Sequence, residues 1–475
     1  MYIDVSKDHP AAVSGAGTRE SVQEAAQDNH AISSCSMEAE TMAYTAYNDP
    51  SLGFTTRQLH AGYDPDEDTY GSKAVPIYQS AAYSLKDIDN CIDIFKFARE
   101  GQSYSRFQNP TNDILERRIA SLDGGAAAVS FGSGMAAITN TILNLCQAGD
   151  NIVLVRTIYG GTTNLLQHIL PQYGICGRFV DDPDDPEAFR AQIDEHSKAV
   201  YVECLGNPLI NIPDFDTLSE IAHEAGIPFV VDNTFATPYL FRPFEHGADI
   251  AVYSATKYLC GHGTTIAGLV VEKGGFNWLS GKFPQFEDFN SKYRDWVGGE
   301  KMDRIMFSQR LRQVYLCDVG ANLSPVSAWL ILQGIETLSL RMREHSRNAE
   351  AVAEFLEQHP AVREVSYPTL KSSKYHKLAG KYFPLGCSGM MMFRVKGSQE
   401  DAASLLEKVH LFGFMVNVGD AHSLITHPAT STHFGQPEEV LHGAGIYPDS
   451  IRLSIGIEDK EDLIQDLGQA LDTLL

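Results

Sequence analysis

The stretch Ile250-Ala251-Val252-Tyr253-Ser254-Ala255-Thr256-Lys257 joins a short apolar run to two hydroxyl groups and a lysine. A second apolar run, Pro228 to Val231, ends in the carboxylate of Asp232. Short runs of this kind, rich in β-branched and aromatic residues, predict buried strands. Ligands of parallel sheets bind beyond the carboxyl ends of the strands, so Asp232 and Lys257 are expected at one site.

This pair of residues suits an aldehyde cofactor that carries a protonated ring nitrogen and a phosphate. A lysine amine forms an imine with the aldehyde, and a carboxylate stabilises the pyridinium that makes the ring an electron sink. Asp232 and Lys257 therefore predict pyridoxal 5'-phosphate as the cofactor. Two ordinary buried strands followed by a solvated lysine would give the same residues, so the pair alone leaves both readings open.

Two further motifs offer partners for a phosphate group. Phe131-Gly132-Ser133-Gly134-Met135 links a predicted strand to a predicted helix, where glycines allow backbone N–H groups to approach an anion. Ser254 and Thr256 occupy alternate positions before Lys257, so both hydroxyls can face the same phosphate. Taken singly, each motif also fits an ordinary strand–helix turn or local turn capping.

Three polar side chains near predicted strands complete a possible site. Tyr159, followed by two glycines, could stack on a flat ring, although a half-buried core tyrosine is the plainer reading. Asn207 follows a strand end and could bind the phenolic oxygen of the ring. Arg452 lies within an apolar strand, where an arginine is usually paired; a substrate α-carboxylate is a suitable partner.

The segment Tyr104-Ser105-Arg106-Phe107-Gln108-Asn109-Pro110-Thr111 supplies another arginine fork. The chain has a formal net charge of −24, so any site for an anionic ligand needs a local cation such as Arg106. A surface salt bridge is the alternative role for this residue. The same net charge argues against nucleic acid or an anionic membrane surface as a partner.

The length of 475 residues exceeds the size of a single growing core and predicts two folded domains with a tail. In the larger domain, strands alternate with helices and predict a mostly parallel sheet in an α/β fold. The strands are expected at Ala127–Phe131, Asn151–Val155, Ala199–Glu203, Pro228–Val231 and Ile250–Tyr253, and the helices at Asn112–Ser121, Met135–Cys146, Thr163–Tyr173 and Asp216–Ala225.

A different pattern follows the sheet region and predicts a smaller α+β domain. Its expected elements are a helical region at Trp329–Glu357, strands near Val362–Tyr367, Met390–Val395 and Ile451–Ser454, a helix from Gln399 and a closing helix. We therefore divide the chain into a disordered acidic tail (1–52), an extended arm that needs another surface (53–110, helical only at Asp87–Arg99), the cofactor domain (111–310) and the C-terminal domain (311–475).

Cysteine usage and the start of the chain bear on location. The eight cysteines are scattered without a C-x-x-C pair or a metal-binding Cys/His spacing, which predicts reduced thiols and no metal site. The first residues lack an apolar signal core, and no apolar run is long enough to span a membrane. The expected location is the cytoplasm.

Together these residues resemble the Cys/Met-metabolism family of fold-type-I pyridoxal-phosphate enzymes, over about residues 53–475. Within that family the chain is most similar to the O-acetylhomoserine sulfhydrylases. The family resemblance rests on Tyr104-Ser-Arg106, Gly132-Ser-Gly134-Met135, Tyr159-Gly-Gly, Asp232-Asn-Thr-Phe235 and Ser254-Ala-Thr256-Lys257; the closer one on Lys257-Tyr-Leu-Cys-Gly261-His262-Gly263-Thr264-Thr265, Gly281-Lys-Phe-Pro284, Leu332–Leu340, Val416-Asn417-Val-Gly419-Asp420-Ala421 and His427-Pro428-Ala429-Thr430.

The resemblance implies a role for each matching residue. Lys257 would be the Schiff-base lysine and proton shuttle, Asp232 the partner of the pyridinium nitrogen, and Tyr159 the residue that stacks on the ring. Arg452 with Asn417 would hold the substrate carboxylate. Phosphate would be bound by Gly134, Met135, Ser254 and Thr256, joined by Tyr104 and Arg106 of a neighbouring subunit. Such sharing implies at least a homodimer, and the family usually forms tetramers.

The implied reaction is γ-replacement on O-acetyl-L-homoserine with sulfide or a thiol, giving homocysteine or methionine and acetate. Two residues depart from the family patterns. His422 stands where sulfhydrylases carry lysine and cystathionine enzymes carry glutamate, which disfavours cysteine as the nucleophile. Gly161 replaces a cysteine of the methionine γ-lyases. The remaining alternatives are a γ-lyase, γ-replacement by a carbon nucleophile in specialised metabolism, and a non-catalytic cofactor-binding subunit.

Overall fold

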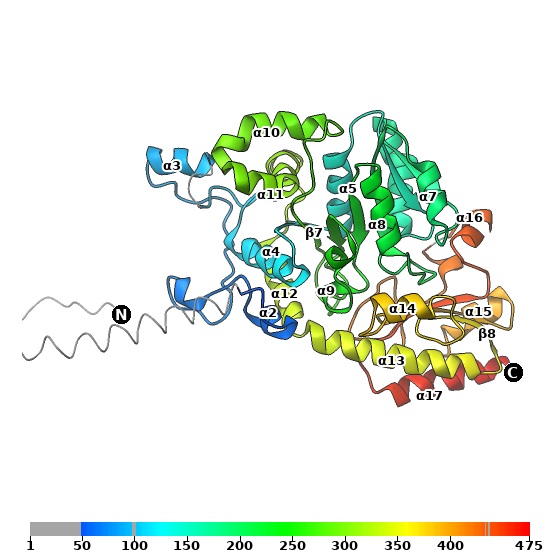
Figure 1. The fold of residues 1–475 in the computed structure, drawn as a ribbon. Coiled ribbons are helices and arrows are strands. Elements are labelled where there is room, and N and C mark those ends of the chain that lie inside the picture. Colours follow the sequence, from blue (N-terminus) through cyan, green and yellow to red (C-terminus); the bar gives the residue numbers. More distant parts are fainter. Residues whose placement is uncertain (1–48, 97–100, 433, 436–437) are drawn as a thin grey trace, which may run out of the picture.

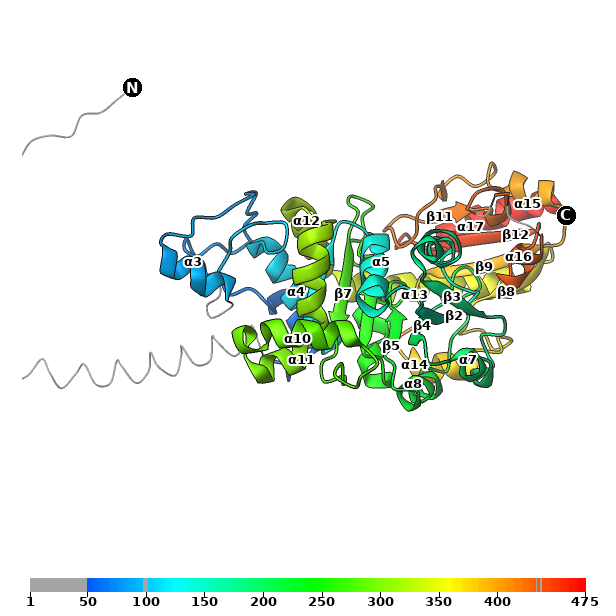
Figure 2. The same ribbon diagram turned by 90° about the horizontal axis from the view of Figure 1, so that it is seen from above.

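The computed structural model describes residues 49–96, 101–432, 434–435 and 438–475 (Figure 1). The predicted tail, residues 1–52, therefore lies almost wholly outside the described residues. The arm and the C-terminal part lie at opposite ends of the molecule, with a sheet between them (Figures 1 and 2).

A seven-stranded sheet forms the centre, in the order β1-β7-β6-β5-β4-β2-β3. Only β7 runs antiparallel to its neighbours, β1 and β6, so the predicted mostly parallel sheet is confirmed. Its strands are β1 (Ala127–Phe131), β2 (Asn151–Val155), β3 (Cys176–Val180), β4 (Ser197–Glu203), β5 (Phe229–Asp232), β6 (Ile250–Tyr253) and β7 (Gly268–Glu272).

All five predicted strands of this sheet are present. Strands β2, β4, β5 and β6 are buried along their whole length, as interior strands of a covered sheet require, whereas β1 lies at the edge of the sheet and is buried except at Ala127. Strands β3 and β7 were not predicted. β3 is an edge strand whose side chains stay partly exposed, so it lacks an apolar run. β7 begins at a glycine and takes its place by tertiary pairing between β1 and β6.

Helices pack on this sheet, with α5 against β6 and β7, and α8 against β4 and β5. The predicted helix at Thr163–Tyr173 is divided into α6, a π-helical turn at Leu165–Ile169 and a 3-10 turn at Leu170–Tyr173. The helices are α4 (Pro110–Asp123), α5 (Gly134–Leu145), α6 (Gly160–Asn164), α7 (Pro186–Gln192), α8 (Phe215–Glu224), α9 (Thr237–Leu240), α10 (Pro284–Val297) and α11 (Gly299–Arg310).

A second sheet of five strands, in the order β10-β11-β12-β9-β8, forms the C-terminal part, as the predicted α+β pattern requires. Its strands are β8 (Val362–Ser366), β9 (Met390–Val395), β10 (Gly413–Phe414), β11 (Leu424–Thr426) and β12 (Ser450–Ser454). The helices of this half are α12 (Pro325–Glu336), α13 (Leu338–Gln358), α14 (His376–Tyr382), α15 (Gln399–Leu405), α16 (Glu438–Gly443) and α17 (Lys460–Leu471).

The long helical region predicted at Trp329–Glu357 contains a break at Thr337, whose φ of −113° and ψ of 10° are not helical. After the break, α13 packs on α9 and on strands β8 and β9, and so joins the two sheets (Figure 1). Helix α11 continues directly into a π-helical segment, Leu311–Val319. The division of the chain near residue 310 stays a prediction.

The described residues of the arm contain two short α-helices, α2 (Phe54–His60) and α3 (Ile88–Phe95), and a 3-10 turn at Pro65–Glu67. Helix α2 was not predicted; it packs on α4 and α12. Helix α3 lies inside the predicted range Asp87–Arg99, and residues 97–100 lie outside the described residues. In the described part of the chain, no helix combines the length and the apolar character that a membrane crossing needs.

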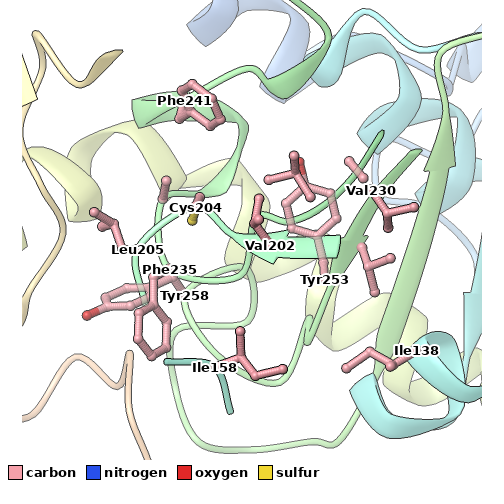
Figure 3. Close-up of a cluster of buried hydrophobic side chains, with 14 of the residues drawn as sticks. Ile138, Ile158, Val202, Cys204, Leu205, Val230, Phe235, Phe241, Tyr253 and Tyr258 are labelled. Atoms are coloured by element: carbon pink, nitrogen blue, oxygen red, sulfur yellow. The ribbon is translucent and has the colours of Figure 1, made fainter. Parts of the chain in front are cut away.

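The hydrophobic core extends through both sheets, and one cluster of it surrounds the central strands of the larger sheet (Figure 3). Val202, Val230 and Tyr253 come from three neighbouring strands and are fully buried. Asn233 and Asp123 tie this core together, because the Tyr253 hydroxyl donates to Asp123 at 2.6 Å and accepts from Asn233 at 3.0 Å. The strand ends that carry Asp232 and Ser254 therefore adjoin a buried, hydrogen-bonded part of the core.

Gly268 in β7 offers a test of how tightly the sheet meets helix α5. A Cβ added there would collide with the backbone carbonyl of Ser133 and lie 2.9 Å from the Ala137 Cβ. We expect Gly268→Ala to lower the free energy of unfolding by about 1–3 kcal/mol, measured by denaturant or thermal unfolding.

Gly380 in α14 is the matched control, since an added Cβ there has no neighbour within 4 Å. Gly380→Ala should leave the stability unchanged or raise it by up to about 1 kcal/mol. Equal melting temperatures for the two variants would contradict the close approach of β7 and α5.

Candidate active site

A cavity of about 430 Å³ lies beyond the carboxyl ends of the central strands. Ile138, Leu205 and Phe235 form part of its apolar wall (Figure 3). Ten of the twelve predicted site residues line it: Gly134, Met135, Tyr159, Asn207, Asp232, Ser254, Thr256, Lys257, Asn417 and Arg452. Tyr104 and Arg106 do not.

Asp232 ends β5 and is 6% exposed. Its Oδ1 accepts hydrogen bonds from the Thr234 N–H at 3.0 Å and the Thr234 hydroxyl at 2.5 Å, and its Oδ2 accepts from the Tyr201 hydroxyl at 3.1 Å. Burial raises the pKa of Asp232, while these hydrogen bonds oppose the rise. No lysine or arginine in the described part of the chain forms an ion pair with this carboxylate, so it fits a ligand that brings a cationic N–H.

Lys257 is half-buried at the centre of the cavity, and its Nζ donates to the Asn417 Oδ1 at 2.7 Å. Burial, and to a smaller extent the nearby charge of Arg452, lower the pKa of Lys257 to about 8. A substantial fraction of the amine is therefore neutral near physiological pH. A neutral amine is the form that attacks an aldehyde, so this lysine fits the predicted cofactor.

Arg452 lies in β12 and is 6% exposed. Its Nη1 donates to the Asn207 Oδ1 at 3.3 Å, and no acidic side chain among the described residues pairs with it. Burial lowers the pKa of Arg452 to about 10. A buried guanidinium beside a cavity is strongly stabilised by an anion, and its fork matches a carboxylate.

The start of helix α5 forms the other end of the cavity. The Ser133 hydroxyl caps this helix by accepting from the Ala136 N–H at 3.0 Å. A Cβ at Gly134 would lie 2.7 Å from the Ser254 Cβ, so the helix N-terminus can approach Ser254 only with glycine there. Thr256 adds a hydroxyl on the same side, which accepts from the Ala267 N–H at 3.0 Å. N–H groups and hydroxyls at a helix N-terminus suit a phosphate.

Tyr159 is 47% exposed at the cavity, and Gly161 makes room for its ring. A Cβ at Gly161 would lie 3.0 Å from the Tyr159 Cζ and 3.1 Å from the Met135 Sδ. The glycine that departs from the γ-lyase pattern thus allows the ring to lie close to the start of α5. On the opposite side, Asn207 precedes Pro208 through a cis peptide bond.

Glu203 is a site residue that sequence reasoning did not assign. It ends β4, is 7% exposed and lines the cavity. Its two carboxylate oxygens accept from the Tyr159 N–H at 2.7 Å and the Asn207 N–H at 3.0 Å. In the sequence, Glu203 is marked only as a glutamate that ends an otherwise apolar run. An ordinary strand end exposed to solvent has the same pattern, so the pattern does not reveal the role of Glu203.

Tyr104 and Arg106 lie in the arm, outside the cavity, and both are exposed. The Arg106 guanidinium lies over the Tyr104 ring, 5.3 Å from its centroid. His422 does not line the cavity either; its side chain is 85% exposed, and its Nδ1 lies 3.1 Å from the Asp420 Oδ1. These three side chains therefore contribute nothing to the cavity within one chain.

The pKa of Lys257 can be tested directly. In the cofactor-free protein, we expect the rate of pyridoxal phosphate binding, followed by absorbance, to rise with pH through a midpoint near 8. Arg452→Gln should raise this midpoint, because the protonated Lys257 amine is more stable without a positive charge beside it. Arg347→Gln is the control, since this arginine is 66% exposed and does not line the cavity, and it should leave the midpoint unchanged. An ordinary lysine midpoint in the unsubstituted protein would show that burial does not tune this amine.

Comparison with known proteins agrees with this geometry. The family model for Cys/Met metabolism PLP-dependent enzymes matches residues 55–472. The chain is 46% identical over 422 residues to the homocysteine synthase of Schizosaccharomyces pombe, covering 88% of this chain and 98% of that protein. It is 43% identical over 430 residues to the O-acetyl-L-homoserine sulfhydrylase of Leptospira meyeri, covering 88% and 96%.

Among solved structures, the fold is similar to the putative O-acetylhomoserine (thiol)-lyase of Campylobacter jejuni, with a TM-score of 0.82 and 41% sequence identity. The match covers 89% of this chain and 100% of that one, which carries a pyridoxyl-lysine phosphate. The predicted fold class and cofactor are thereby confirmed, and the chain belongs to the family of pyridoxal-phosphate-dependent enzymes of cysteine and methionine metabolism.

Proposed function

We propose that this enzyme replaces the γ-substituent of O-acetyl-L-homoserine with sulfide or a thiol, giving homocysteine or methionine and acetate. The observation that carries the proposal is a buried Arg452 that lacks an acidic partner among the described residues and lines the same cavity as Lys257. That arrangement suits an amino-acid substrate, held by its carboxylate while its amino group meets the cofactor. The names of the relatives above support the choice of substrate.

Bound pyridoxal phosphate supplies an electron sink that stabilises negative charge on the carbons next to the substrate amino group. Lys257 would hold its aldehyde carbon, Asp232 its ring nitrogen and Asn207 its phenolic oxygen, with Tyr159 stacked on the ring. Its phosphate would be bound by Gly134, Met135, Ser254 and Thr256.

Arg452 and Asn417 would bind the substrate α-carboxylate. When it is not bound to the cofactor, the Lys257 amine would take protons from the substrate α-carbon and β-carbon and later return them. A pKa of about 8 suits this role, because such an amine both accepts and donates protons near neutral pH. Tyr159 would assist the proton transfer that accompanies departure of acetate from the γ-carbon.

The nucleophile is proposed to be small and to carry no ammonium group. Ile266 and Val416 line the cavity, and both are more than half exposed, so its opening is apolar. The glutamate that cystathionine enzymes carry is replaced by His422, whose side chain points to solvent. An incoming cysteine with its ammonium group would therefore lack a carboxylate at position 422 itself.

We further propose a homo-oligomer, at least a dimer and, as is usual in the family, a tetramer, in which Tyr104 and Arg106 complete the site of the neighbouring subunit. Supporting this, the arm exposes large apolar side chains, with Tyr70 92%, Ile88 74% and Phe95 55% exposed. The cytoplasm is the proposed location, and the seven described cysteines, all without disulfides, agree with it.

The proposed reaction is tested with the purified enzyme, O-acetyl-L-homoserine and sulfide, with products identified by mass. We expect homocysteine and acetate only when sulfide is present. Lys257→Ala should lower turnover about a thousandfold or more, since both cofactor attachment and proton transfer are lost.

Other products would contradict the proposal in different ways. A 2-oxo acid and ammonia formed without sulfide would indicate a γ-lyase. A product with a new carbon–carbon bond, formed when a carbon acid replaces sulfide, would indicate the carbon nucleophile. Bound cofactor without any product would indicate a non-catalytic subunit.

Sharing of residues between subunits predicts complementation. Arg106→Ala and Lys257→Ala should each be nearly inactive, but refolded together they should regain about a quarter of full activity, because half of randomly paired dimers are hybrids with one intact site of two. Asp232→Ala mixed with Lys257→Ala is the control and should regain nothing, since both residues line the cavity of one chain. Equal activity of the two mixtures would place Arg106 outside the site.

A further inference from the structure

Glu203 connects two loops that approach the cavity from different strands. Its Oε1 accepts the backbone N–H of Tyr159, which follows β2, at 2.7 Å. Its Oε2 accepts the backbone N–H of Asn207, which follows β4, at 3.0 Å. One carboxylate thus fixes the backbone of both Tyr159, proposed to stack on a face of the cofactor ring, and Asn207, proposed to bind the phenolic oxygen at its edge.

Only an acidic side chain can form this bridge. A carboxylate accepts hydrogen bonds on both of its oxygens, whereas the amide of glutamine has one acceptor and directs an NH₂ group at the second donor. Replacing the carboxylate by an amide would therefore lose one of the two bonds and set two donors against each other. Such a mismatch in a buried place displaces one of the loops.

The position of Glu203 is unfavourable for stability alone. It lies opposite Asp232 in the register of β4 and β5, and both carboxylates are buried. Burial, and then the charge of Asp232, raise the pKa of Glu203, while the two N–H groups oppose the rise. Among the described residues, no cation forms an ion pair with either carboxylate. An apolar residue would cost less here, which indicates that the bridge serves the site.

We propose that Glu203 is a positioning residue that orients the Tyr159 ring and the Asn207 amide against the bound cofactor. Through Asn207, whose Oδ1 accepts from Arg452 at 3.3 Å, the same bridge also orients the guanidinium proposed to bind substrate. Glu203 acts only through these neighbours. The inference rests on the proposed assignment of Tyr159, Asn207 and Arg452.

Glu272 provides a matched control in the same sheet. It ends β7, is 2% exposed, and accepts from the backbone N–H groups of Phe307 at 3.2 Å and Ser308 at 2.8 Å. Burial raises the pKa of Glu272 to about 7. It does not line the cavity. Glu272 also accepts from the Ser308 hydroxyl at 2.7 Å. Glu272→Gln therefore imposes a similar mismatch with two backbone N–H groups, away from the cofactor.

The experiment compares full-length Glu203→Gln and Glu272→Gln as holoenzymes. We expect similar drops in melting temperature for the two variants. Only Glu203→Gln should change the visible circular dichroism of the bound cofactor, which reports how the ring is seated, and raise the dissociation constant for pyridoxal phosphate about tenfold. Unchanged dichroism and cofactor affinity in Glu203→Gln, relative to Glu272→Gln, would overturn the proposal.

If Glu203→Gln does not fold, Glu203→Asp decides, because it keeps both acceptors but draws them back by one methylene. A change in dichroism is again expected, and an unchanged band overturns the proposal. Both readouts are taken without substrate. If the unsubstituted enzyme forms no homocysteine from sulfide, the proposed reaction is refuted. The role of Glu203 would still be decided by the dichroism and the cofactor affinity.

Discussion

Four acidic or basic side chains line one cavity, yet none of them forms an ion pair with another: Glu203, Asp232, Lys257 and Arg452. Removing charges from water without pairing them is among the most unfavourable arrangements in a folded protein. The fold stabilises each charge by hydrogen bonds instead, such as those from Thr234 to Asp232. A pyridinium for Asp232 and a carboxylate for Arg452 would supply the missing opposite charges. Ligand binding and stability of the site are therefore coupled.

The arrangement of these four charges depends on how the two sheets are placed relative to each other. The end of β5 and the residues after β6 carry Asp232 and Lys257, while the C-terminal sheet carries Arg452. Arg341 of α13 secures the junction: its guanidinium donates to the Tyr258 carbonyl at 2.8 Å and to the Gly334 carbonyl at 2.7 Å. Gly261, just after Lys257, leaves the space that this guanidinium fills. A second contact, between the Lys381 Nζ and Asp216 at 2.8 Å, ties α14 to the start of α8.

The sequence predicted the parts of the fold in which local pattern and tertiary role coincide. Strands such as Ile250–Tyr253 are continuous apolar runs because they are buried on both faces. Elements whose position depends on distant partners were missed. Strand β7 is placed by β1 and β6, and the break at Thr337 carries no glycine or proline to mark it. Among site residues, Arg452 stands out as a charge in an apolar strand, whereas Glu203 looks like an ordinary strand end until its two N–H partners are known.

The charges around the cavity also bear on the arm. Lys257 and Arg452 are the cations among the described residues that line it, and both already have proposed roles with the aldehyde carbon and the substrate carboxylate. The end of the cavity proposed to bind phosphate holds N–H groups and hydroxyls, but no cationic side chain of the described residues. In a protein of net charge −24, the partial positive charge of a helix N-terminus stabilises a doubly charged phosphate only weakly. An arginine from a second chain would supply the positive charge that this end of the cavity lacks. Arg106 is exposed on the arm, which also exposes large apolar side chains that a second subunit would bury.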